Sequence, residues 1–310
     1  MFKIAFLIPY FGKWPEWMEL YIDSIERNSS VDFHFITDCD TTISSAKNII
    51  FHSISFEEYV AQAQQKLGVP INISNPYKIC DLRPFFGVIH EDIIQDYDFF
   101  GWTDVDLLFG DIRSFYTDDI LANYDVLSSH KIRLAGHCAL LRTTKKYREI
   151  GFKVYDWKTA LLNPNFVGID EHGMTNALCM TFWDKLSEKV KMPWISSLFK
   201  WRRNQKMKPY YFKEQYTTPF TAIPWLDGSL HSKQPDTWKY QNGVITNTRD
   251  DKNFMYIHFM NFKSDQWRHD NTPAPWNALD QLVFASCQDI KNGVEISNLG
   301  IRPSKIDHSK

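Results

Sequence analysis

The stretch "FFGWTDVDLLFGD", residues 99–111, sets two acids in an otherwise apolar and aromatic run. Burying a carboxylate is costly unless another group pairs with it, so a buried strand carrying Asp104 and Asp106 is expected to deliver them to a functional site. Alternate residues of a strand face the same side. The two carboxylates are therefore predicted to lie together, while Val105 points into the protein.

The residues around these acids suggest what they bind. The run 97–106 predicts a buried strand with the acids at its carboxyl end, where open α/β sheets bind ligands. A few oxygen ligands suit Mg²⁺ or Mn²⁺, which keep positions open for substrate phosphates. Neither G-x-G-x-x-G after the first strand nor a P-loop is present. A metal ion is therefore expected to neutralise a diphosphate here; the alternative is a pair of turn or helix-capping acids.

Periodicity along the chain predicts an α/β fold. The runs 3–9 and 32–37 are β-rich, and the segment 16–28 between them has helical periodicity, which makes a β-α-β opening. Pro84 is expected to start or bend a later helix. The other predicted elements are strands at 48–54, 124–130, 136–144 and 253–262, and helices at 55–68, 78–94 and 170–186.

Composition narrows the class of protein. With 310 residues, 44% of them hydrophobic, the chain can build one elaborated domain. A net charge of -2 argues against nucleic acid as a partner. Five scattered cysteines without a C-x-x-C pair predict reduced thiols and a cytoplasmic protein. Pro9 and Gly12 interrupt the apolar N-terminus, which predicts a strand rather than a signal peptide, and no run is long enough to span a membrane.

The segment "KICDLRPFFGVIHEDIIQDYDFFGWTDVDLLFGDI" resembles the core of the GT-A glycosyltransferases with their Asp-x-Asp motif, and most of all the bacterial polysaccharide and lipopolysaccharide enzymes. The likeness runs through about residues 1–186. It implies a Rossmann-like mixed sheet flanked by helices, with residues 1–186 as the nucleotide-sugar-binding and catalytic core. Residues 187–310 would be the acceptor-binding and membrane-proximal part of the same domain. The implied donor is a UDP-sugar.

The resemblance also assigns metal-site residues. It makes Asp106 the firmer metal ligand, and Asp104 a contact to the metal and to the ribose or donor sugar. The late run "YIHFMNFKSDQW" supplies His258 as a further ligand, followed by Lys263 and Trp267 near the diphosphate. This order resembles the glycogenin-like retaining branch, although the glycine usual between the His and the Lys is missing. The alternative for His258 is a core histidine on a strand.

A second group of residues precedes the Asp-x-Asp motif. Lys78, Asp81 and Arg83 stand near the start of the predicted helix before the metal strand. The family likeness implies that Asp81 and Arg83 orient the donor sugar or brace the Asp-x-Asp loop, since an arginine fork can bind a carboxylate or phosphate through two nitrogens. The alternative is an ordinary surface ion pair on the first helical turn.

The end of the first strand is the expected seat of the nucleotide base. The run "IPYFG" places Pro9, Tyr10 and Phe11 where the GT-A fold binds the nucleotide. An aromatic ring there can stack on uracil. The alternative is that these rings form an edge of the hydrophobic core, because 15% of the chain is aromatic.

Acceptor-binding residues are expected in two further runs. "VGIDEHG" puts Asp170 and Glu171 at a predicted helix start, where capping explains one acid. The family likeness makes one of them a base or an electrostatic support for the acceptor hydroxyl. In "AGHCALLR", Gly136 allows close approach and His137 can bind a sugar hydroxyl. Trp267 is assigned to the acceptor as well.

The stretch 189–213 contains eight Lys or Arg and no acid, with aromatic and aliphatic residues between them. Basic residues beside aromatics favour contact with an anionic membrane surface. A lipid-linked glycan acceptor would then be reached from the cytoplasmic face. The alternatives are a solvated basic loop and, less favoured, RNA binding.

These observations predict a glycosyltransferase that uses Mn²⁺ or Mg²⁺ to move a hexose from a nucleotide sugar to a growing bacterial surface glycan, with retention. One rival is a sugar nucleotidyltransferase, for which the basic glycine-rich loop after the first strand is reduced to Gly12 and Lys13. Another is a glycan- or membrane-binding module of the same fold without turnover. A glycoside hydrolase is disfavoured because Asp104 and Asp106 are close in sequence.

Overall fold

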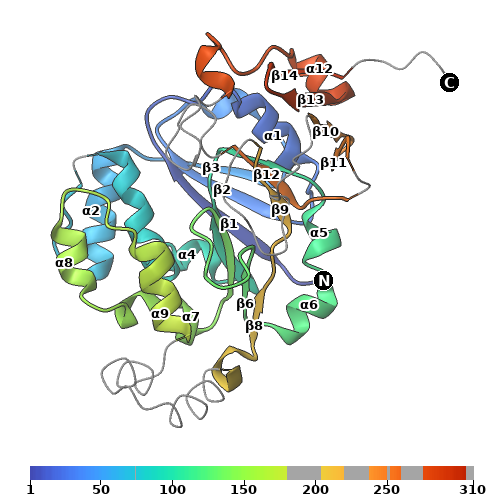
Figure 1. Ribbon diagram of the computed structural model, residues 1–310. Helices are drawn as coiled ribbons and strands as arrows, with labels where there is room; N and C mark the ends of the chain where they lie inside the picture. The colour runs from blue at the N-terminus through green and yellow to red at the C-terminus, as the bar shows by residue number, and fades with distance from the viewer. Residues whose placement is uncertain (74, 180–203, 220–236, 250–251, 260–274, 305–310) are drawn as a thin grey trace.

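The computed structural model describes residues 1–73, 75–179, 204–219, 237–249, 252–259 and 275–304 (Figure 1). Its centre is a seven-stranded mixed sheet in the order β3-β2-β1-β4-β7-β6-β8, in which only β7 runs antiparallel to its neighbours. The predicted α/β class, a mixed sheet flanked by helices, is confirmed. The strands are β1 (Ile4–Tyr10), β2 (Asp32–Thr37), β3 (Ile49–Ser53), β4 (Phe99–Thr103), β6 (Val126–Ser128), β7 (Cys138–Arg142) and β8 (Tyr210–Phe212).

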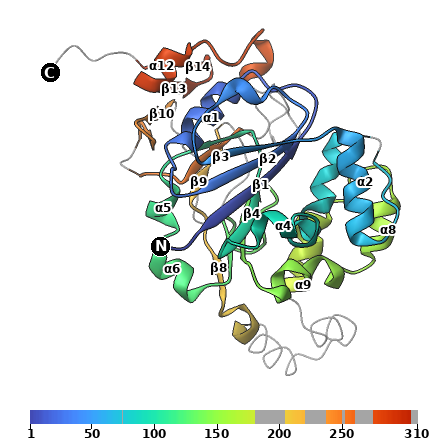
Figure 2. The same ribbon diagram turned by 180° about the vertical axis from the view of Figure 1, so that it is seen from behind.

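Helices cover both faces of this sheet (Figures 1 and 2). Neighbouring residues of β1 enter opposite cores, with Phe6 on the side of α1 and Leu7 on the side of α2. One face carries α1 (Met18–Glu26), α5 (Ile112–Phe115) and α6 (Asp118–Asn123). The other carries α2 (Phe56–Leu67), α3 (Phe86–Ile89), α4 (Glu91–Ile94), α7 (Lys145–Arg148), α8 (Trp157–Leu162) and α9 (Met174–Cys179).

Two smaller sheets extend the molecule on the α1 side. In the first, β12 (Tyr256–His258) lies between β5 (Leu107–Phe109) and β9 (Tyr216–Thr217). The second is an antiparallel sheet of β11 (Val244–Asn247), β10 (Thr237–Gln241), β13 (Val294–Ser297) and β14 (Gly300–Pro303), accompanied by α12 (Cys287–Asn292). Leu20 of α1 and Leu108 of β5 share a core with this sheet. The chain thus leaves the main sheet after β4 to build a second layer.

Local sequence signals explain several elements. The predicted strand 32–37 is confirmed as β2, and the predicted helix 55–68 is confirmed as α2. Ser55 and Glu58 form a reciprocal capping box at the start of α2. Gly68 ends the helix at a φ of 65°, a left-handed conformation that glycine adopts without strain. These ends are fixed by neighbouring residues and need no distant contact.

Two predicted elements are wrong in detail. The single helix expected at 78–94 is a 3-10 helix, η2 (Pro76–Phe85), followed by α3 and α4. Pro84 lacks a backbone N–H, and in an α-helix its ring would clash with the carbonyl four residues earlier, so one continuous α-helix is interrupted here. The strand expected at 97–106 ends at Thr103, so Asp104 and Asp106 lie in the bend between β4 and β5. The chain turns there because β5 pairs with β12 rather than continuing the main sheet.

The predicted helix 170–186 begins with a π-helical turn, η4 (Ile169–Gly173), which continues into α9. Residues 180–186, the basic stretch as far as Arg203, and also Lys263 and Trp267 lie outside the described residues. Within the described residues, none of the helices has the length and hydropathy required to cross a bilayer. All five cysteines are described, and no disulfide links them.

Candidate functional site

The acidic bend between β4 and β5 is anchored on both sides by backbone hydrogen bonds. The Asp104 N–H donates to the His137 carbonyl at 2.9 Å, which extends the β4–β7 ladder by one step. The Phe259 N–H donates to the Asp106 carbonyl at 2.9 Å, which extends the β5–β12 ladder. Two different sheets therefore fix the two acids, and the second sheet brings His258 beside them.

Asp104, Asp106 and His258 offer ligand atoms that all lie within 4.8 Å of one another. Nε2 of His258 is 3.6 Å from Oδ2 of Asp106. Among the described residues, neither Oδ1 of Asp106 nor Nδ1 of His258 has a hydrogen-bond partner, although both atoms are buried. Burial raises the pKa of Asp106, but the neighbouring His258 outweighs it and leaves this pKa below its usual value. Two carboxylates and an imidazole with unused atoms fit a divalent ion such as Mn²⁺.

Arg83 ties this bend to the acids that follow it in the sequence. Its guanidinium contacts Oδ1 of Asp104 through one nitrogen and Oδ2 of Asp170, at 2.9 Å, through the other. The second nitrogen also donates to the Gly136 carbonyl at 2.6 Å. The side chain of Arg83 is 12% exposed and that of Asp170 only 2%. A single buried cation thus positions the Asp-x-Asp bend, the strand leading into β7 and the start of η4.

The electrostatics of the two carboxylates on Arg83 are dominated by burial. Burial raises the pKa of Asp170 to about 7, and the Arg83 charge only partly opposes this. Burial likewise raises the pKa of Asp104, against the opposing effect of Arg83. Gly136 is required by close packing, because a Cβ there would lie 2.8 Å from Cγ of Glu171. Gly136 therefore leaves room for the Glu171 side chain, and close approach of an acceptor at this glycine stays a prediction.

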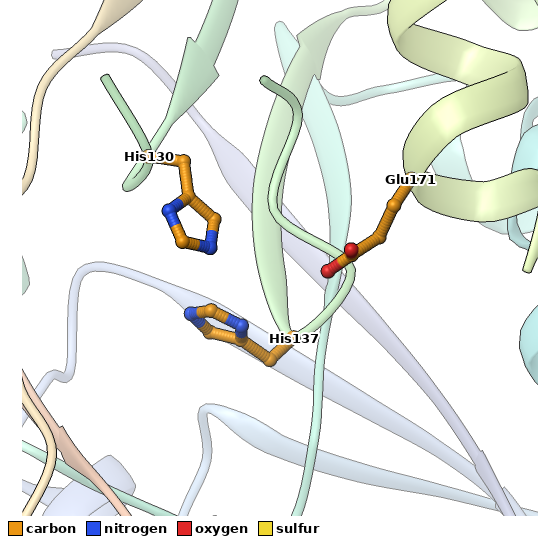
Figure 3. Close-up of side chains that lie close together, drawn as sticks. All are labelled: His130, His137 and Glu171. Atoms are coloured by element: carbon orange, nitrogen blue, oxygen red, sulfur yellow. The ribbon is translucent and has the colours of Figure 1, made fainter. Parts of the chain in front are cut away.

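A second cluster lies on the other side of Gly136. Figure 3 shows the carboxylate of Glu171 pointing toward the imidazole rings of His130 and His137. One ligand atom from each of the three residues falls within 4.8 Å of the others. Histidine and glutamate form a donor set that also suits a metal ion. Both histidines are buried, and burial lowers the pKa of His130 to about 3 and that of His137 well below 6.5.

Arg133 already supplies a positive charge at this second cluster. Its guanidinium lies 3.5 Å from Oε2 of Glu171 and 3.2 Å from Nε2 of His130. A metal ion would have to displace that guanidinium and compete with its contacts to two of the three ligands. Within the part of the chain that the structure describes, no Lys or Arg forms ion pairs with two ligand residues of the Asp104 cluster: Arg83 contacts Asp104, while the carboxylate of Asp106 faces His258. We therefore favour the Asp104 cluster as the metal site.

His137 was expected to bind a sugar hydroxyl, but the structure buries its side chain. It is 6% exposed, and its Nε2 lies 2.8 Å from the Tyr256 hydroxyl, which in turn contacts Ser129. Its ring also packs on the His258 ring, with the centroids 4.2 Å apart. His137 thus positions His258 from behind, so contact with a sugar hydroxyl is a less suitable role for it.

Lys78 and Asp81 pair with each other, and not with the acids of the Asp104 cluster. Their side chains form an ion pair at 2.8 Å and are 1% and 0% exposed, so this is not a surface pair. Lys78 also donates to the carbonyls of Ala160 and Asn165. Asp81 accepts backbone N–H groups from three successive residues, Val167, Gly168 and Ile169. The pair fastens the loop before η4 and so sets the position of Asp170.

The three residues at the end of β1 have different surroundings. Phe11 is 8% exposed and packs on Phe56 and Tyr59 in the core beneath α2. Tyr10 is half-buried and stacks on Trp14, with the ring centroids 5.1 Å apart. Pro9 is half-buried in the β1–β2 pairing. Phe11 is therefore a core residue. Of the three residues, Tyr10 is the one that we retain as a candidate for stacking on the nucleotide base.

No sequence pattern identified three residues of these clusters as site residues, namely His130, Arg133 and Tyr256. For His130, antiparallel pairing of the two predicted strands 124–130 and 136–144 would have placed it near His137. Ser128 of β6 pairs with Ala139 of β7, and continuing the antiparallel register places His130 opposite His137. Tyr256 was visible only as part of a predicted strand, because its contacts come from residues more than a hundred positions away.

Comparison with known protein families gives a match over most of the chain. A family model described as "Family of unknown function (DUF6625)" matches residues 6–282. The chain belongs to this family. The match takes in every described site residue discussed above, from β1 to His258. No curated protein matches the chain.

Solved structures similar to this DUF6625 member include three glycosyltransferases. The galactosyltransferase LgtC, with donor and acceptor sugar analogues, is 16% identical, with a TM-score of 0.33 over 57% of this chain and 70% of LgtC. Mouse xyloside xylosyltransferase 1 is 10% identical, with a TM-score of 0.34 over 61% of this chain and 83% of that enzyme. GlyE of Streptococcus pneumoniae TIGR4 is 16% identical, with a TM-score of 0.31 over 64% of this chain and 51% of GlyE.

Proposed function

We propose that the protein is a metal-dependent glycosyltransferase that moves a hexose from a UDP-sugar to a glycan. The observation that carries the proposal is the Asp104, Asp106 and His258 cluster beyond the end of β4, in which a buried atom of Asp106 and one of His258 have no hydrogen-bond partner among the described residues. The Asp-x-Asp resemblance supplies the reaction class. The position of the acids beyond the carboxyl end of a central strand is where this type of sheet binds its ligands.

On the donor side, Asp104, Asp106 and His258 would hold Mn²⁺ or Mg²⁺. The ion would supply positive charge to the diphosphate as the glycosyl–phosphate bond breaks. Arg83 fixes the Asp104 carboxylate, so the ligand set is arranged before substrate binds. Tyr10 is the candidate stacking surface for uracil. Lys263 remains a proposed partner of the departing diphosphate, from its place in the sequence alone.

On the acceptor side, the acceptor oxygen bonds to the anomeric carbon and its proton leaves to a base. Glu171 is the better-placed acid of the two, since its side chain is 27% exposed whereas that of Asp170 is 2% exposed. The Gly136 N–H donates to Oε1 of Glu171 at 3.0 Å and orients the carboxylate. We therefore assign Glu171 to the acceptor as base or electrostatic support, and Asp170 to positioning through Arg83.

The decisive experiment is calorimetric titration of UDP into the protein with Mn²⁺ and again with EDTA. We expect binding that requires the metal and is lost in Asp106→Ala. The exposed Asp119 of α6 provides a matched control, because Asp119→Ala removes an acid without touching the cluster. Metal-independent UDP binding, or equal binding by Asp106→Ala, would show that the metal assignment is wrong.

A screen of UDP-sugars then separates the proposal from its rivals. A transferase releases UDP and forms a glycoside, whereas a nucleotidyltransferase would form or consume a nucleoside triphosphate, and a binding module would do neither. Retention of the anomeric configuration is expected and is read by proton NMR of the product. A bacterial surface glycan as acceptor, and docking of residues 189–213 on an anionic membrane, remain part of the proposal.

A further inference from the structure

Two exposed aromatic rings lie together next to the acceptor side of the site. The rings of Tyr77 and Phe166 meet at a centroid distance of 5.0 Å and an interplanar angle of 69°. Tyr77 is 64% exposed and Phe166 40% exposed, and the adjacent Val167 is 47% exposed. Edge-to-face rings with open faces form an angled apolar surface. Such a surface can receive the apolar face of a ligand.

The position of this pair relative to the acids follows from its connections. Phe166 stands four residues before Asp170. Asp81 accepts the N–H groups of Val167, Gly168 and Ile169, which fixes the short loop between Phe166 and Asp170. Burial raises the pKa of Tyr77 to about 12, and the charges of Asp104 and Asp170 contribute to the rise, which agrees with this placement.

The buried Lys78–Asp81 ion pair fixes the positions of both rings. Lys78, next to Tyr77, donates to the carbonyl of Asn165, next to Phe166. Asp81 accepts the Val167 N–H on the other side of Phe166 at 2.7 Å. A buried ion pair contributes little net stability by comparison with apolar packing, so its retention here favours a positional role.

Gly168 allows the loop to close on this ion pair. Its φ of 81° lies in the left-handed region, where the chain can turn so that three successive N–H groups reach Asp81. A Cβ at Gly168 would lie 3.6 Å from Cζ of Phe166, an ordinary contact, so the glycine is needed for its φ and not for space. The two rings are thus held in place before any ligand arrives, which lowers the entropic cost of binding.

We propose that Tyr77 and Phe166 form a stacking platform for one pyranose ring of the acceptor. This inference rests on the proposed function and adds the subsite that orients the acceptor. A pyranose has an apolar face of C–H groups and a rim of hydroxyls. It fits a site that combines aromatic rings with a polar group nearby in the same loop and turn, here the carboxylate of Glu171, whose side chain is 27% exposed.

Saturation-transfer NMR with methyl glycosides of glucose, galactose and N-acetylglucosamine tests the platform without requiring turnover. We expect transfer to the C–H protons of at least one glycoside, and binding about fivefold to tenfold weaker in Tyr77→Ala and in Phe166→Ala. Tyr77→Phe keeps the ring and should bind like the parent. Tyr155→Ala is the matched control, since Tyr155 is 86% exposed and precedes α8, whereas Phe166 follows it.

Titration of UDP with Mn²⁺ into the same variants separates this inference from the proposed function. UDP binding that persists in Tyr77→Ala while glycoside binding falls supports the platform. UDP binding with glycoside binding that Tyr77→Ala leaves unchanged overturns the platform but not the glycosyltransferase. Glycoside binding that depends on Tyr77 in a protein that binds no UDP supports the platform and refutes the donor site. No transfer to any glycoside in the parent overturns the platform and leaves the rings as a protein contact.

Discussion

Replacing Arg83 by methionine removes the cation that joins Asp104 to Asp170. Methionine keeps most of the apolar stem, so the change isolates the guanidinium. Removing one partner of a buried ion pair costs about 3–5 kcal/mol, because the other charge is left buried. The side chain of Asp170 is 2% exposed and that of Asp104 29% exposed, so most of the cost should come from Asp170.

Protonation limits that loss. The pKa of Asp170 is already raised to about 7 by burial with Arg83 in place, so without Arg83 its carboxyl should be neutral at pH 7. We therefore expect a loss of about 3 kcal/mol in the free energy of unfolding, at the lower end of the range for a broken buried pair. Urea denaturation followed by circular dichroism measures this, with an unchanged slope if the denatured state is unaffected.

Two comparisons make the result decisive. Arg148→Met breaks an ion pair with Glu91, a carboxylate whose side chain is 51% exposed, and should cost at most about 1 kcal/mol. Asp170→Asn introduced into Arg83→Met should recover part of the loss, since asparagine is neutral without taking up a proton and so removes the cost of protonating Asp170 on folding. If Arg83→Met cost no more than Arg148→Met, or if Asp170→Asn gave no recovery, Arg83 would not be the cation that organises the site.

The remaining predictions concern packing, pH and the basic segment. Gly136→Ala would place a Cβ 2.9 Å from Oε1 of Glu171, so we expect about 1–3 kcal/mol lower stability in urea; an unchanged midpoint would contradict this contact. Burial lowers the pKa of His90 to about 3, so the unfolded chain binds this proton more tightly. Stability should then fall as the pH drops from 6.5 toward 3, by up to about 1.4 kcal/mol per unit, and His90→Phe should show a shallower decline. Alanine in place of the aromatic and basic side chains of 194–203 should reduce sedimentation with anionic vesicles while sparing UDP-sugar hydrolysis.

Much of the main sheet could be predicted from local pattern. The strand 32–37 and the helix 55–68 appear where periodicity and capping residues place them, because those signals act between residues a few positions apart. The prediction of one helix at 78–94 was wrong, because contacts with distant residues decide the structure of this segment. Pro84 interrupts a continuous α-helix there, and the buried Lys78–Asp81 pair fixes η2 to a loop more than eighty residues away.

The site shows the same division. Two acids in an apolar run indicated a functional site at Asp104 and Asp106, since burial of unpaired carboxylates is costly, but the run predicted a strand where the structure has a bend. Nothing local indicated that Arg83 would serve Asp104 and Asp170 together, or that His137 would lie behind His258. These contacts depend on which strands pair, and strand pairing joins segments that sequence periodicity cannot relate.

The sequence by itself determined much of the alternation of strands and helices, the placement of Asp104 and Asp106 at the carboxyl end of a central strand, and the candidate ligand types. Only the tertiary structure decided that β5 leaves the main sheet to pair with β12, and this pairing carries His258 to Asp106. It also decided that Phe11 belongs to the core, while Tyr77 and Phe166 are exposed at the site. The physical reason is that hydrophobic burial sets local pattern, whereas the partners of buried charges are chosen by the packing of distant elements.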